Sequence, residues 1–312
     1  MIKENKIAVI GLSGESIFMK VDHFHHNGET VVADVFHKEY GGKGYNQAVA
    51  CKRFGADVSF LTVIGDDQIG EEVIKSLEKE NINGTFIKKN NFKSAYATIL
   101  IDKIGNNQVT CFPGVSKNLT KEDVLLFEKE IATSKILLLQ MEMSDESLFE
   151  AISIAKKYDT LVILNPAPAH QIPNEILKQC DIITPNENEC EVLFNISSNY
   201  QTNLLKLEQQ NVIVTLGSKG SIVKDGDVVY EIEPLKVNPL NTTGAGDTYN
   251  GVLAACILEG FSLKNACIYA NFAASISVTK EFVIDSIPNR LEIESKVIDF
   301  YKKNNVKLEE EN

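Results

Sequence analysis

The segment Asn241–Asp247, which reads NTTGAGD, contains residue types that could hold and transfer a phosphoryl group. Two of its glycines stand directly before an apolar pattern that predicts a helix, with Val252 and Cys256 on one face. The first turn of a helix presents N–H groups without intrahelical partners, and glycine lets an anion approach them closely. The segment therefore predicts an anion pocket that suits a phosphoryl group.

Asp247 stands at the start of that predicted helix, where its carboxylate would repel a bound phosphate. A helix N-cap is one explanation for an aspartate at this place. A carboxylate beside a transferring phosphoryl group can also accept the proton of an attacking hydroxyl group, which Lys and Arg cannot do. We therefore expect Asp247 to be a catalytic base.

A second glycine-rich stretch, Gly41–Gln47, reads GGKGYNQ and again precedes a helical pattern. Lys43 offers donors, and Asn46 offers both a donor and an acceptor, as recognition of a polar sugar requires. A helix entry turn with a solvated lysine is the alternative interpretation. The chain has no GxxxxGK[ST] motif, so it is not a P-loop enzyme.

The elements that must position these residues alternate along the chain. Short β-rich apolar runs alternate with helical patterns that begin near Lys43, Ile69 and Ser144, which predicts an α/β fold with a mostly parallel sheet covered on both faces. Ligands of such sheets bind beyond the carboxyl ends of the strands. Polar or turn-forming residues follow four of the apolar runs, at Glu142, at Asn165, at 185–189 and at 216–220. The sequence thus predicts one site along this edge.

Two stretches, within about residues 16–40 and 95–112, depart from the alternation and resemble strand-turn-strand units with Gly and Asn at the turns. We expect them to form a small β-sheet that covers the main domain as a lid or pairs with another subunit, giving a possible homodimer, because exposed strand edges need protection. The main domain should span residues 1–300. Residues 301–312 should form a charged tail.

The composition of the chain limits the classes of molecule that it is expected to bind. The 31 Lys and Arg residues against 43 Asp and Glu residues give a net charge of −12, which repels nucleic acid and acidic membrane surfaces. The apolar run near the N-terminus is too short for a secretory signal, and no run reaches the length of a membrane helix. We therefore expect no nucleic-acid or membrane partner and a cytoplasmic location.

The chain resembles a ribokinase-type member of the PfkB carbohydrate kinase family from about residue 6 to about residue 290. GGKGYNQAVACKRFGADVSFLTVIGDDQIG is similar to the family's N-terminal signature, and NTTGAGDTYNGVLAAC is similar to its C-terminal one. NPAPA, TPNE and VTLGSKG are similar to ribokinase-type segments in kind and order. The resemblance implies a three-layer αβα sandwich with a small β lid, ATP and Mg²⁺ as co-substrates, and attack by a sugar hydroxymethyl oxygen.

The resemblance also implies roles for individual residues. The catalytic set comprises the base Asp247 and the anion hole Gly244, Ala245 and Gly246. The sugar-contacting positions are Gly42, Lys43, Asn46, Glu142 and Ser16. The positions for ATP are Asn186, Thr215, Gly217, Gly220 and Asn271, of which Asn271 flanks the adenine. Asn186 and Glu189 match an NxxE element that organises Mg²⁺ through water and phosphate.

Two departures from the family pattern affect these expectations. Family members usually carry an Asp that grips sugar hydroxyls where this chain has Ser16, and the adjacent Glu15 could replace that Asp only if Gly14 allowed a bulge. Relatives also hold a monovalent cation with an Asp where this chain has Asn241, so we expect weak dependence on K⁺. Lys280 could alternatively place an ammonium group near that position.

Two hypotheses follow. The first is a sugar kinase, with ribose as the favoured acceptor and a nucleoside or another pentose or hexose as the runner-up. The second is a catalytically weak relative that binds a sugar or nucleotide as a sensor. Intact Asp247 and the GAG turn favour the enzyme, whereas Ser16 favours the sensor.

Overall fold

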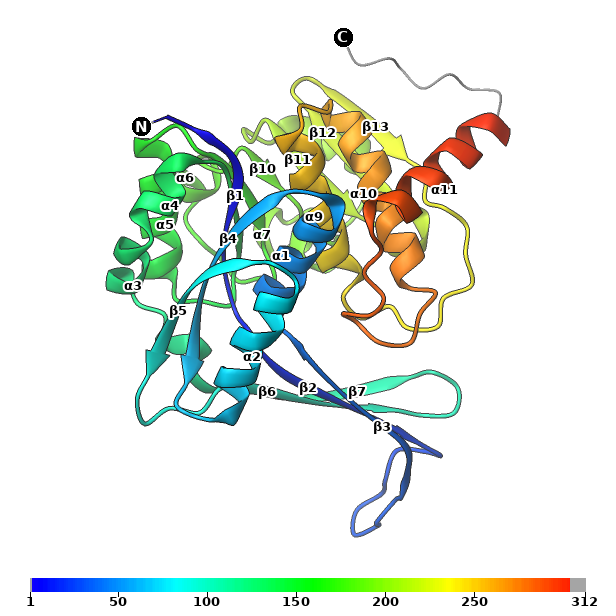
Figure 1. Ribbon diagram of the computed structural model, residues 1–312. Helices are drawn as coiled ribbons and strands as arrows, with labels where there is room; N and C mark the ends of the chain where they lie inside the picture. Colours follow the sequence, from blue (N-terminus) through cyan, green and yellow to red (C-terminus); the bar gives the residue numbers. More distant parts are fainter. Residues whose placement is uncertain (1, 304–312) are drawn as a thin grey trace.

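A nine-stranded sheet runs through the middle of the protein in the computed structural model, which describes residues 2–303 (Figure 1). The strand order is β13-β12-β11-β10-β9-β8-β1-β4-β5, and all neighbours are parallel except the pairs β11–β12 and β12–β13. The strands are β1 (Glu4–Ile10), β4 (Asp57–Gly65), β5 (Asn83–Lys89), β8 (Ser134–Gln140), β9 (Leu161–Asn165), β10 (Ile182–Ile183), β11 (Asn211–Thr215), β12 (Ser221–Asp225) and β13 (Val228–Ile232).

Helices cover both faces of this sheet, which confirms the predicted three-layer α/β arrangement. Along β1, Ile7 and Val9 belong to one core, whereas Ala8 and Ile10 belong to the other, and all four are fully buried. A strand buried on both faces reads as a continuous apolar run, because neither set of alternate side chains meets water. This burial is the reason for the unbroken apolar sequence of the central strands.

The helices divide between the two faces. One layer contains α1 (Lys43–Phe54), α2 (Gln68–Lys79), α9 (Ala245–Leu258), α10 (Leu263–Ser277) and α11 (Arg290–Lys303). The other side carries α3 (Lys121–Leu126), α4 (Glu128–Thr133), α5 (Asp145–Lys157), α6 (Asn174–Leu177), α7 (Glu187–Phe194) and α8 (Tyr200–Asn203). The helix starts expected near Lys43, Ile69 and Ser144 are confirmed by α1, α2 and α5.

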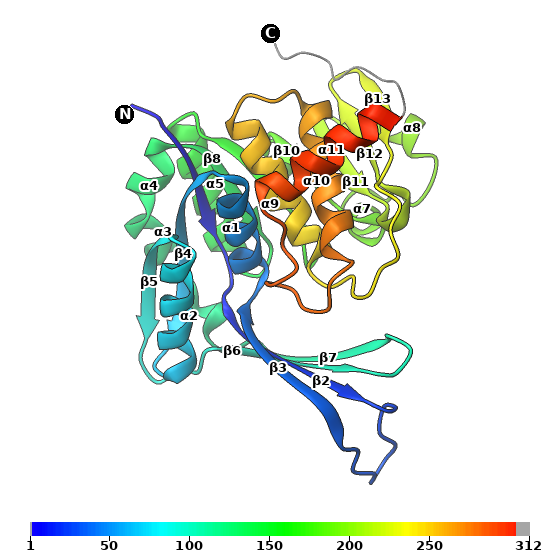
Figure 2. The same cartoon turned by 45° about the vertical axis from the view of Figure 1, so that its right-hand side comes forward.

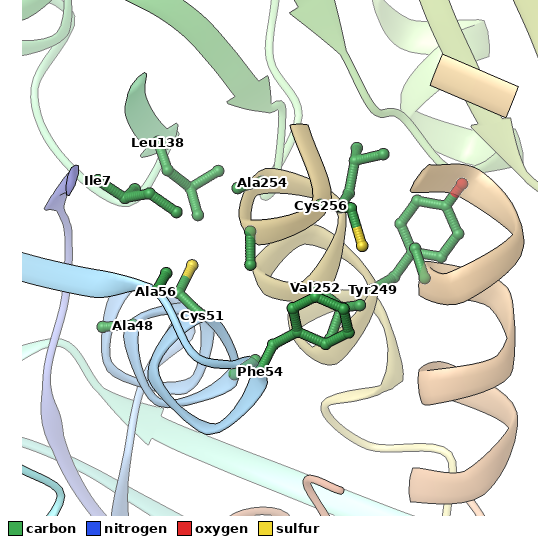
Figure 3. Packing of buried hydrophobic residues seen from close by; sticks show 14 of the residues in the cluster. Ile7, Ala48, Cys51, Phe54, Ala56, Leu138, Tyr249, Val252, Ala254 and Cys256 are labelled. Carbon is green, nitrogen blue, oxygen red and sulfur yellow. The ribbon is translucent and has the colours of Figure 1, made fainter. Parts of the chain in front are cut away.

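Helix α9 differs from the sequence expectation of one apolar face, because nearly all of its residues from Asp247 to Leu258 are buried. It packs between α1 and α10 as well as against the sheet. Gly251 permits the close crossing with α1, since a Cβ there would lie 2.4 Å from Ala50 Cβ and 2.6 Å from the Gln47 carbonyl oxygen. Figure 3 shows the packing, in which Phe54 of α1 lies beside Val252 of α9.

The four strands β2 (Gly14–Val21), β3 (Ala33–Gly41), β6 (Ala95–Ile101) and β7 (Asn107–Phe112) form a second sheet in the order β3-β2-β6-β7. Strands β2 and β6 are parallel, and the outer pairs are antiparallel. This sheet projects from the body beneath the loop that joins α10 and α11 (Figures 1 and 2). The strands expected within about residues 16–40 and 95–112 are therefore present, and this second sheet is called the lid below.

The chain end differs in part from the expected tail at 301–312. Residues 301–303 are the last residues of α11, and residues 304–312 lie outside the described part of the chain. Among the helices of residues 2–303, none is long and apolar enough to cross a membrane.

Candidate functional site

A cavity of about 830 Å³ lies at the carboxyl-end edge of the central sheet, where the sequence predicts the site. It brings together residues from α1, α7, α9, α10 and the segment after β11. The predicted site residues that line it are Lys43, Asn186, Glu189, Thr215, Gly217, Gly220, Gly244, Ala245, Gly246, Asp247 and Asn271. Gly42, Asn46, Glu142 and Ser16 do not line this cavity, although Asn46 contacts Asp247 and Glu142 contacts Lys43, which do line it.

The start of α9 has the features of an anion pocket. Gly244 is the N-cap residue in a left-handed conformation (φ 77°), and no side chain caps the helix. The N–H of Ala245 makes only a long 3.4 Å contact with the Thr242 carbonyl oxygen. The first-turn N–H groups are therefore available to an anion, and the helix dipole favours negative charge there.

Two side-chain amides from α1 hold the carboxylate of Asp247, which is only 7% exposed. Asn46 Nδ2 donates to Asp247 Oδ2 at 2.9 Å, and Gln47 Nε2 donates to Asp247 Oδ1 at 3.0 Å. Each carboxylate oxygen thus has a fixed donor and still has lone pairs for the proton of a substrate hydroxyl. The close crossing of α1 and α9 makes both contacts geometrically possible.

Sequence reasoning missed the supporting role of Gln47. Its Nε2 also donates to Asn165 Oδ1 at 3.1 Å, and its Oε1 accepts from Gln140 Nε2 at 2.7 Å. These amides connect the ends of β8 and β9 to the carboxylate of Asp247. The signal in the sequence is that Gln140 and Asn165 end apolar strands. Buried amides of this kind need hydrogen-bond partners, and Gln47 is the partner of both.

A small space lies beside Gly41, between β2 and α1, where the sequence predicts that the acceptor binds. A Cβ on Gly41 would lie 3.2 Å from Asn46 Oδ1 and 3.7 Å from Ser16 Oγ, so both oxygens face the same small space. Asn46 Oδ1 is buried and has no hydrogen-bond partner within residues 2–303. A buried acceptor of this kind calls for a donor, such as a hydroxyl group of a ligand.

Glu15 does not replace the missing aspartate. The register of β2 with β3 and β6 is regular from Gly14 to Lys20, so no bulge turns Glu15 toward the site. Its carboxylate instead pairs with Lys38 Nζ at 2.6 Å on the opposite face of the lid. Ser16, and not Glu15, is therefore the residue that faces the space beside Gly41.

Lys43 and Glu142 meet next to Asp247. The backbone N–H of Lys43 donates to Glu142 Oε2 at 3.2 Å. Burial raises the pKa of Glu142 to about 7, and the charge of Lys43 opposes this shift. The nearby carboxylate of Asp247 is the largest cause that raises the pKa of Lys43. The ammonium group of Lys43 thus interacts with several carboxylates.

Asn186 and Glu189 form a capping box at the start of α7. Asn186 Oδ1 accepts the N–H of Glu189 at 2.9 Å, and Glu189 Oε2 accepts the N–H of Asn186 at 2.8 Å. Burial raises the pKa of Glu189, an effect to which the nearby charge of Asp247 adds. The cap fixes both side chains beside Thr215, which pairs with Asn186 in a parallel bridge.

The remaining predicted residues lie along the other wall. Gly217 and Gly220 form the turn between β11 and β12, and both have positive φ. Asn271 Nδ2 donates to Ser221 Oγ at 3.1 Å and to the Ile232 carbonyl oxygen at 3.3 Å. These bonds fix the Asn271 side chain on α10 at the cavity wall.

Asn241 links the segment before α9 to the loop after α10. Its Nδ2 donates to the Glu281 carbonyl oxygen at 2.7 Å, and its Oδ1 accepts the N–H of Thr243 at 3.0 Å. Lys280 Nζ lies 3.5 Å from Glu292 Oε1 of α11. The structure therefore pairs Lys280 with an acidic side chain outside the anion pocket.

The chain is similar to known carbohydrate kinases over most of its length. Residues 4–290 match the model of the pfkB family carbohydrate kinases. The chain is 35% identical to ribokinase of Haemophilus influenzae, over 92% of this chain and 96% of that protein. The crystal structure of ribokinase from Thermotoga maritima superposes with a TM-score of 0.85 at 36% identity, covering 94% of this chain and 99% of the other.

Arabidopsis thaliana ribokinase complexed with ribose and ATP superposes with a TM-score of 0.83 at 26% identity, covering 95% of this chain and 98% of that one. The family match spans both glycine-rich segments and the strand ends that line the cavity. The chain therefore belongs to the pfkB family of carbohydrate kinases.

Proposed function

We propose that this carbohydrate kinase transfers the γ-phosphoryl group of ATP to the hydroxymethyl oxygen of a small sugar, with D-ribose as the first candidate acceptor. The observation that carries the proposal is the carboxylate of Asp247, held by two amides at an uncapped helix start. The same Asn46 side chain turns its unpartnered oxygen toward the acceptor space. We place the reaction in the cytoplasm, where ATP is available.

Asp247 accepts the proton of the attacking hydroxyl group in this mechanism. The sugar oxygen forms a bond to the γ-phosphorus while the bond from that phosphorus to the β,γ-bridging oxygen breaks, and ADP leaves. The N–H groups of the segment Gly244–Gly246 and the first turn of α9 stabilise the negative charge on the phosphoryl oxygens. Donors fixed in this way act mainly on the transition state, because they need no reorganisation during the reaction.

The acceptor contacts come from Gly42, Lys43, Asn46, Glu142 and Ser16. Ribose is favoured because the Arabidopsis relative binds ribose and ATP with the same fold. Ser16 supplies one hydroxyl where a carboxylate would supply two acceptor oxygens, so adjacent sugar hydroxyls are held less tightly. This favours including acceptors with fewer hydroxyl groups, among them 2-deoxyribose and nucleosides, as second candidates.

The nucleotide site comprises Asn186, Thr215, Gly217, Gly220 and Asn271, which line the cavity beyond α9. The turn at Gly217 and Gly220 leaves backbone groups open to the ligand, and Asn271 flanks the adenine. ATP would thus place its triphosphate between this turn and the start of α9.

Mg²⁺ fits the charge distribution of this site. Glu142, Glu189 and Asp247 all interact with the single ammonium group of Lys43, and the phosphates of ATP add further negative charge. Glu189, with Asn186 beside it, would hold Mg²⁺ through water, as is usual for Mg²⁺ bound mainly by phosphates. The bound ion would neutralise charge on the phosphates.

A second part of the proposal is a homodimer formed through the lid. Phe18 faces the body and is buried, so its neighbours Ile17 and Met19 on β2 face the other way. Met19 pairs with Phe36 on β3, which is 66% exposed, and with Leu100 on β6. A contiguous apolar face of this kind marks an interaction surface, and a second lid offers the complementary one.

An ADP-release assay with ATP, Mg²⁺ and a panel of acceptors tests the kinase proposal. The panel contains ribose, 2-deoxyribose, other pentoses, hexoses and nucleosides. We expect ADP release that requires the acceptor, with a kcat/KM for one acceptor well above the rest. Binding of sugar and ATP without acceptor-dependent ADP release would instead support a sensor.

A further inference from the structure

Glu39 is a buried carboxylate that has no role in the mechanism above. It lies on β3 of the lid and is 8% exposed. Its Oε1 accepts the backbone N–H of Val283 at 3.0 Å, and its Oε2 accepts the N–H of Ile284 at 3.1 Å. Both acceptors of one lid side chain are therefore used by the loop that joins α10 and α11, which faces the lid in Figures 1 and 2.

That loop touches the predicted anion hole through Val283. A Cβ on Gly244 would lie 2.4 Å from Val283 Cγ1, so the Val283 side chain packs directly on the N-cap residue of α9. Val283 also packs with Phe18 and Ile99 of the lid in a small apolar cluster. The position of Val283 thus depends on the lid and limits the space at Gly244.

The lid contacts the loop at a second residue, since the ring of Phe282 stacks on His37 of β3 with centroids 3.6 Å apart. The main body holds the same loop from the other side. Arg53 Nη1 of α1 donates to the carbonyl oxygens of Ile284 at 2.6 Å and Ile287 at 3.0 Å. Glu39 and Arg53 therefore hold the N–H and the C=O of Ile284 from opposite directions.

A carboxylate suits this position because it offers two acceptors to two adjacent N–H groups. A glutamine in its place would accept with one oxygen only and would turn an NH₂ donor toward the other N–H. Buried backbone N–H groups need such partners in a loop that forms no regular ladder. The arrangement thus fixes the loop backbone at Val283 and Ile284 and, through Val283, the start of α9.

We infer that Glu39 is a positioning residue that couples the lid to the anion hole, by holding Val283 against Gly244. The inference rests on the proposed role of Gly244–Gly246 in binding the transferred phosphoryl group. A lid that closes over an acceptor then also sets the geometry of the helix start that receives the phosphoryl group. A misplacement of catalytic groups by about 1 Å can lower turnover by roughly 100-fold.

Burial raises the pKa of Glu39, and the carboxylate of Asp285 in the loop adds to this shift, whereas His37 and the two N–H groups oppose it. His37 Nε2 lies 3.6 Å from Glu39 Oε2. The same loop and lid carry a second, exposed ion pair between Lys20 and Glu281 at 2.6 Å. The ion pair of Lys20 does not involve Glu39, so replacing Glu39 tests the hydrogen bonds to Val283 and Ile284 and leaves that pair in place.

The test compares Glu39→Gln with a matched control, Glu15→Gln. Glu15 is as buried as Glu39 and lies in the same sheet, but its partner is Lys38 on the opposite face. Backbone amide exchange is measured in the full chain with Mg²⁺ and an ATP analogue. Amide exchange reports local opening of the backbone. We therefore expect Glu39→Gln, which loosens the loop, to accelerate exchange at least about tenfold at Val283 or Ile284 and also within residues 244–247. Glu15→Gln should change neither segment.

Turnover gives the second readout. With the best acceptor of the wild type, Glu39→Gln should lower kcat about 10- to 100-fold while KM for the acceptor changes less than about threefold. Val283→Ala removes the methyl groups that contact Gly244, so it should lower kcat although the Glu39 carboxylate is intact. If Glu39 acts through Val283, the double variant should be no worse than the poorer single variant.

Three outcomes would overturn the inference. The first is that Glu39→Gln accelerates amide exchange at residues 283–284 but leaves exchange at residues 244–247 unchanged. The others are that Glu39→Gln and Glu15→Gln change exchange equally, or that the two losses of kcat add fully in the double variant. If Glu39→Gln does not fold, the Val283→Ala variant still decides whether contact at Gly244 affects kcat. Failure of the proposed function has a separate signature, which is a wild type without acceptor-dependent turnover. The exchange comparison does not depend on that turnover.

Discussion

At the scale of single residues, the site is a set of buried polar groups that hold one carboxylate in a fixed orientation. Asn46 and Gln47 each donate to one oxygen of Asp247, and Gln47 is fixed in turn by Asn165 and Gln140. Each amide has little freedom to turn, because its other end is also bonded or buried. The proposed base is thus positioned before any ligand binds, which reduces reorganisation during the reaction.

Replacing Asp247 with Asn tests the base directly. The amide keeps the size of the side chain but cannot accept the substrate proton, so kcat should fall by about 10²- to 10⁴-fold. KM for ATP should change little, because the nucleotide contacts are made by other residues. Steady-state kinetics of the folded variant check this, and near-normal turnover would refute the assignment of Asp247.

The Ser16→Asp variant tests the acceptor contact. Ser16 Oγ faces the space beside Gly41 and Asn46 Oδ1, and an aspartate there would offer paired acceptors to adjacent hydroxyl groups. We expect KM for ribose or another pentose with adjacent hydroxyls to fall, and KM for acceptors without them to stay or rise. A KM that rises or stays fixed for every sugar would show that this side of the site binds its acceptor differently.

At the scale of elements, three segments meet at the start of α9, namely α1, the loop between α10 and α11, and the lid. The close crossing at Gly251 brings α1 to Asp247, and the contact of Val283 with Gly244 brings the loop to the same helix start. Asn241 joins the segment before α9 to that loop by a side-chain hydrogen bond to Glu281. The helix start is therefore held by protein contacts on several sides.

This arrangement supports weak dependence on K⁺. The Asn241 amide donates to the Glu281 carbonyl oxygen, so that oxygen has a protein donor, and the neutral side chain attracts a cation less than an aspartate would. Turnover measured with K⁺ in place of a bulky organic cation, at constant ionic strength and Mg²⁺, should rise less than about tenfold, or roughly 1.4 kcal/mol of barrier.

Asn241→Asp is the control for the K⁺ measurement. It removes the donor to Glu281 and adds a negative charge, so its turnover should depend on K⁺ more strongly than that of the wild type. A wild type that K⁺ activates more than tenfold would contradict the expectation, whatever the variant does.

At the scale of the whole molecule, the lid has two faces that take part in different proposed contacts. One face of the lid packs on the loop that contacts the anion hole, and the other face carries the apolar residues of the proposed dimer. The net charge of −12 gives no long-range attraction for an anionic ligand, so we expect the phosphates of ATP to be held by local donors at the start of α9. In the proposed dimer, a second copy would cover the exposed apolar side chains on this other face of the lid.

The dimer is tested with the exposed residue Phe36. Light scattering of the wild type at micromolar concentration should give twice the 34.6 kDa mass of one chain. Phe36→Lys should shift the mass toward one chain, because it places a charge in the proposed apolar contact. Leu291→Lys, at an exposed leucine of α11, should leave the mass unchanged. A wild type with the mass of one chain would exclude a stable dimer.

The sequence by itself determined the features that depend on local order. Alternating apolar runs and helical patterns predicted the layered α/β fold, and the two strand-turn-strand segments predicted the lid. The glycine-rich turn before a helix predicted an anion pocket with Asp247 in its first turn. The layered fold, the strands of the lid and the helix start at Ala245 are confirmed, because hydrophobic period, helix starts and turns are set by residues close together in the chain. The anion pocket stays a prediction.

Only the tertiary structure decided the contacts between distant segments. Asn46 meets Asp247 across 201 positions of the chain, and Glu39 meets Val283 across 244, so no local period indicates either pair. The burial of α9 on all sides likewise depends on what packs around it, and its own sequence predicted one apolar face. Glu15 and Ser16 are adjacent in the chain, yet their side chains lie on opposite faces of β2 because its register is regular. Glu15 therefore pairs with Lys38, whereas Ser16 faces the space beside Gly41.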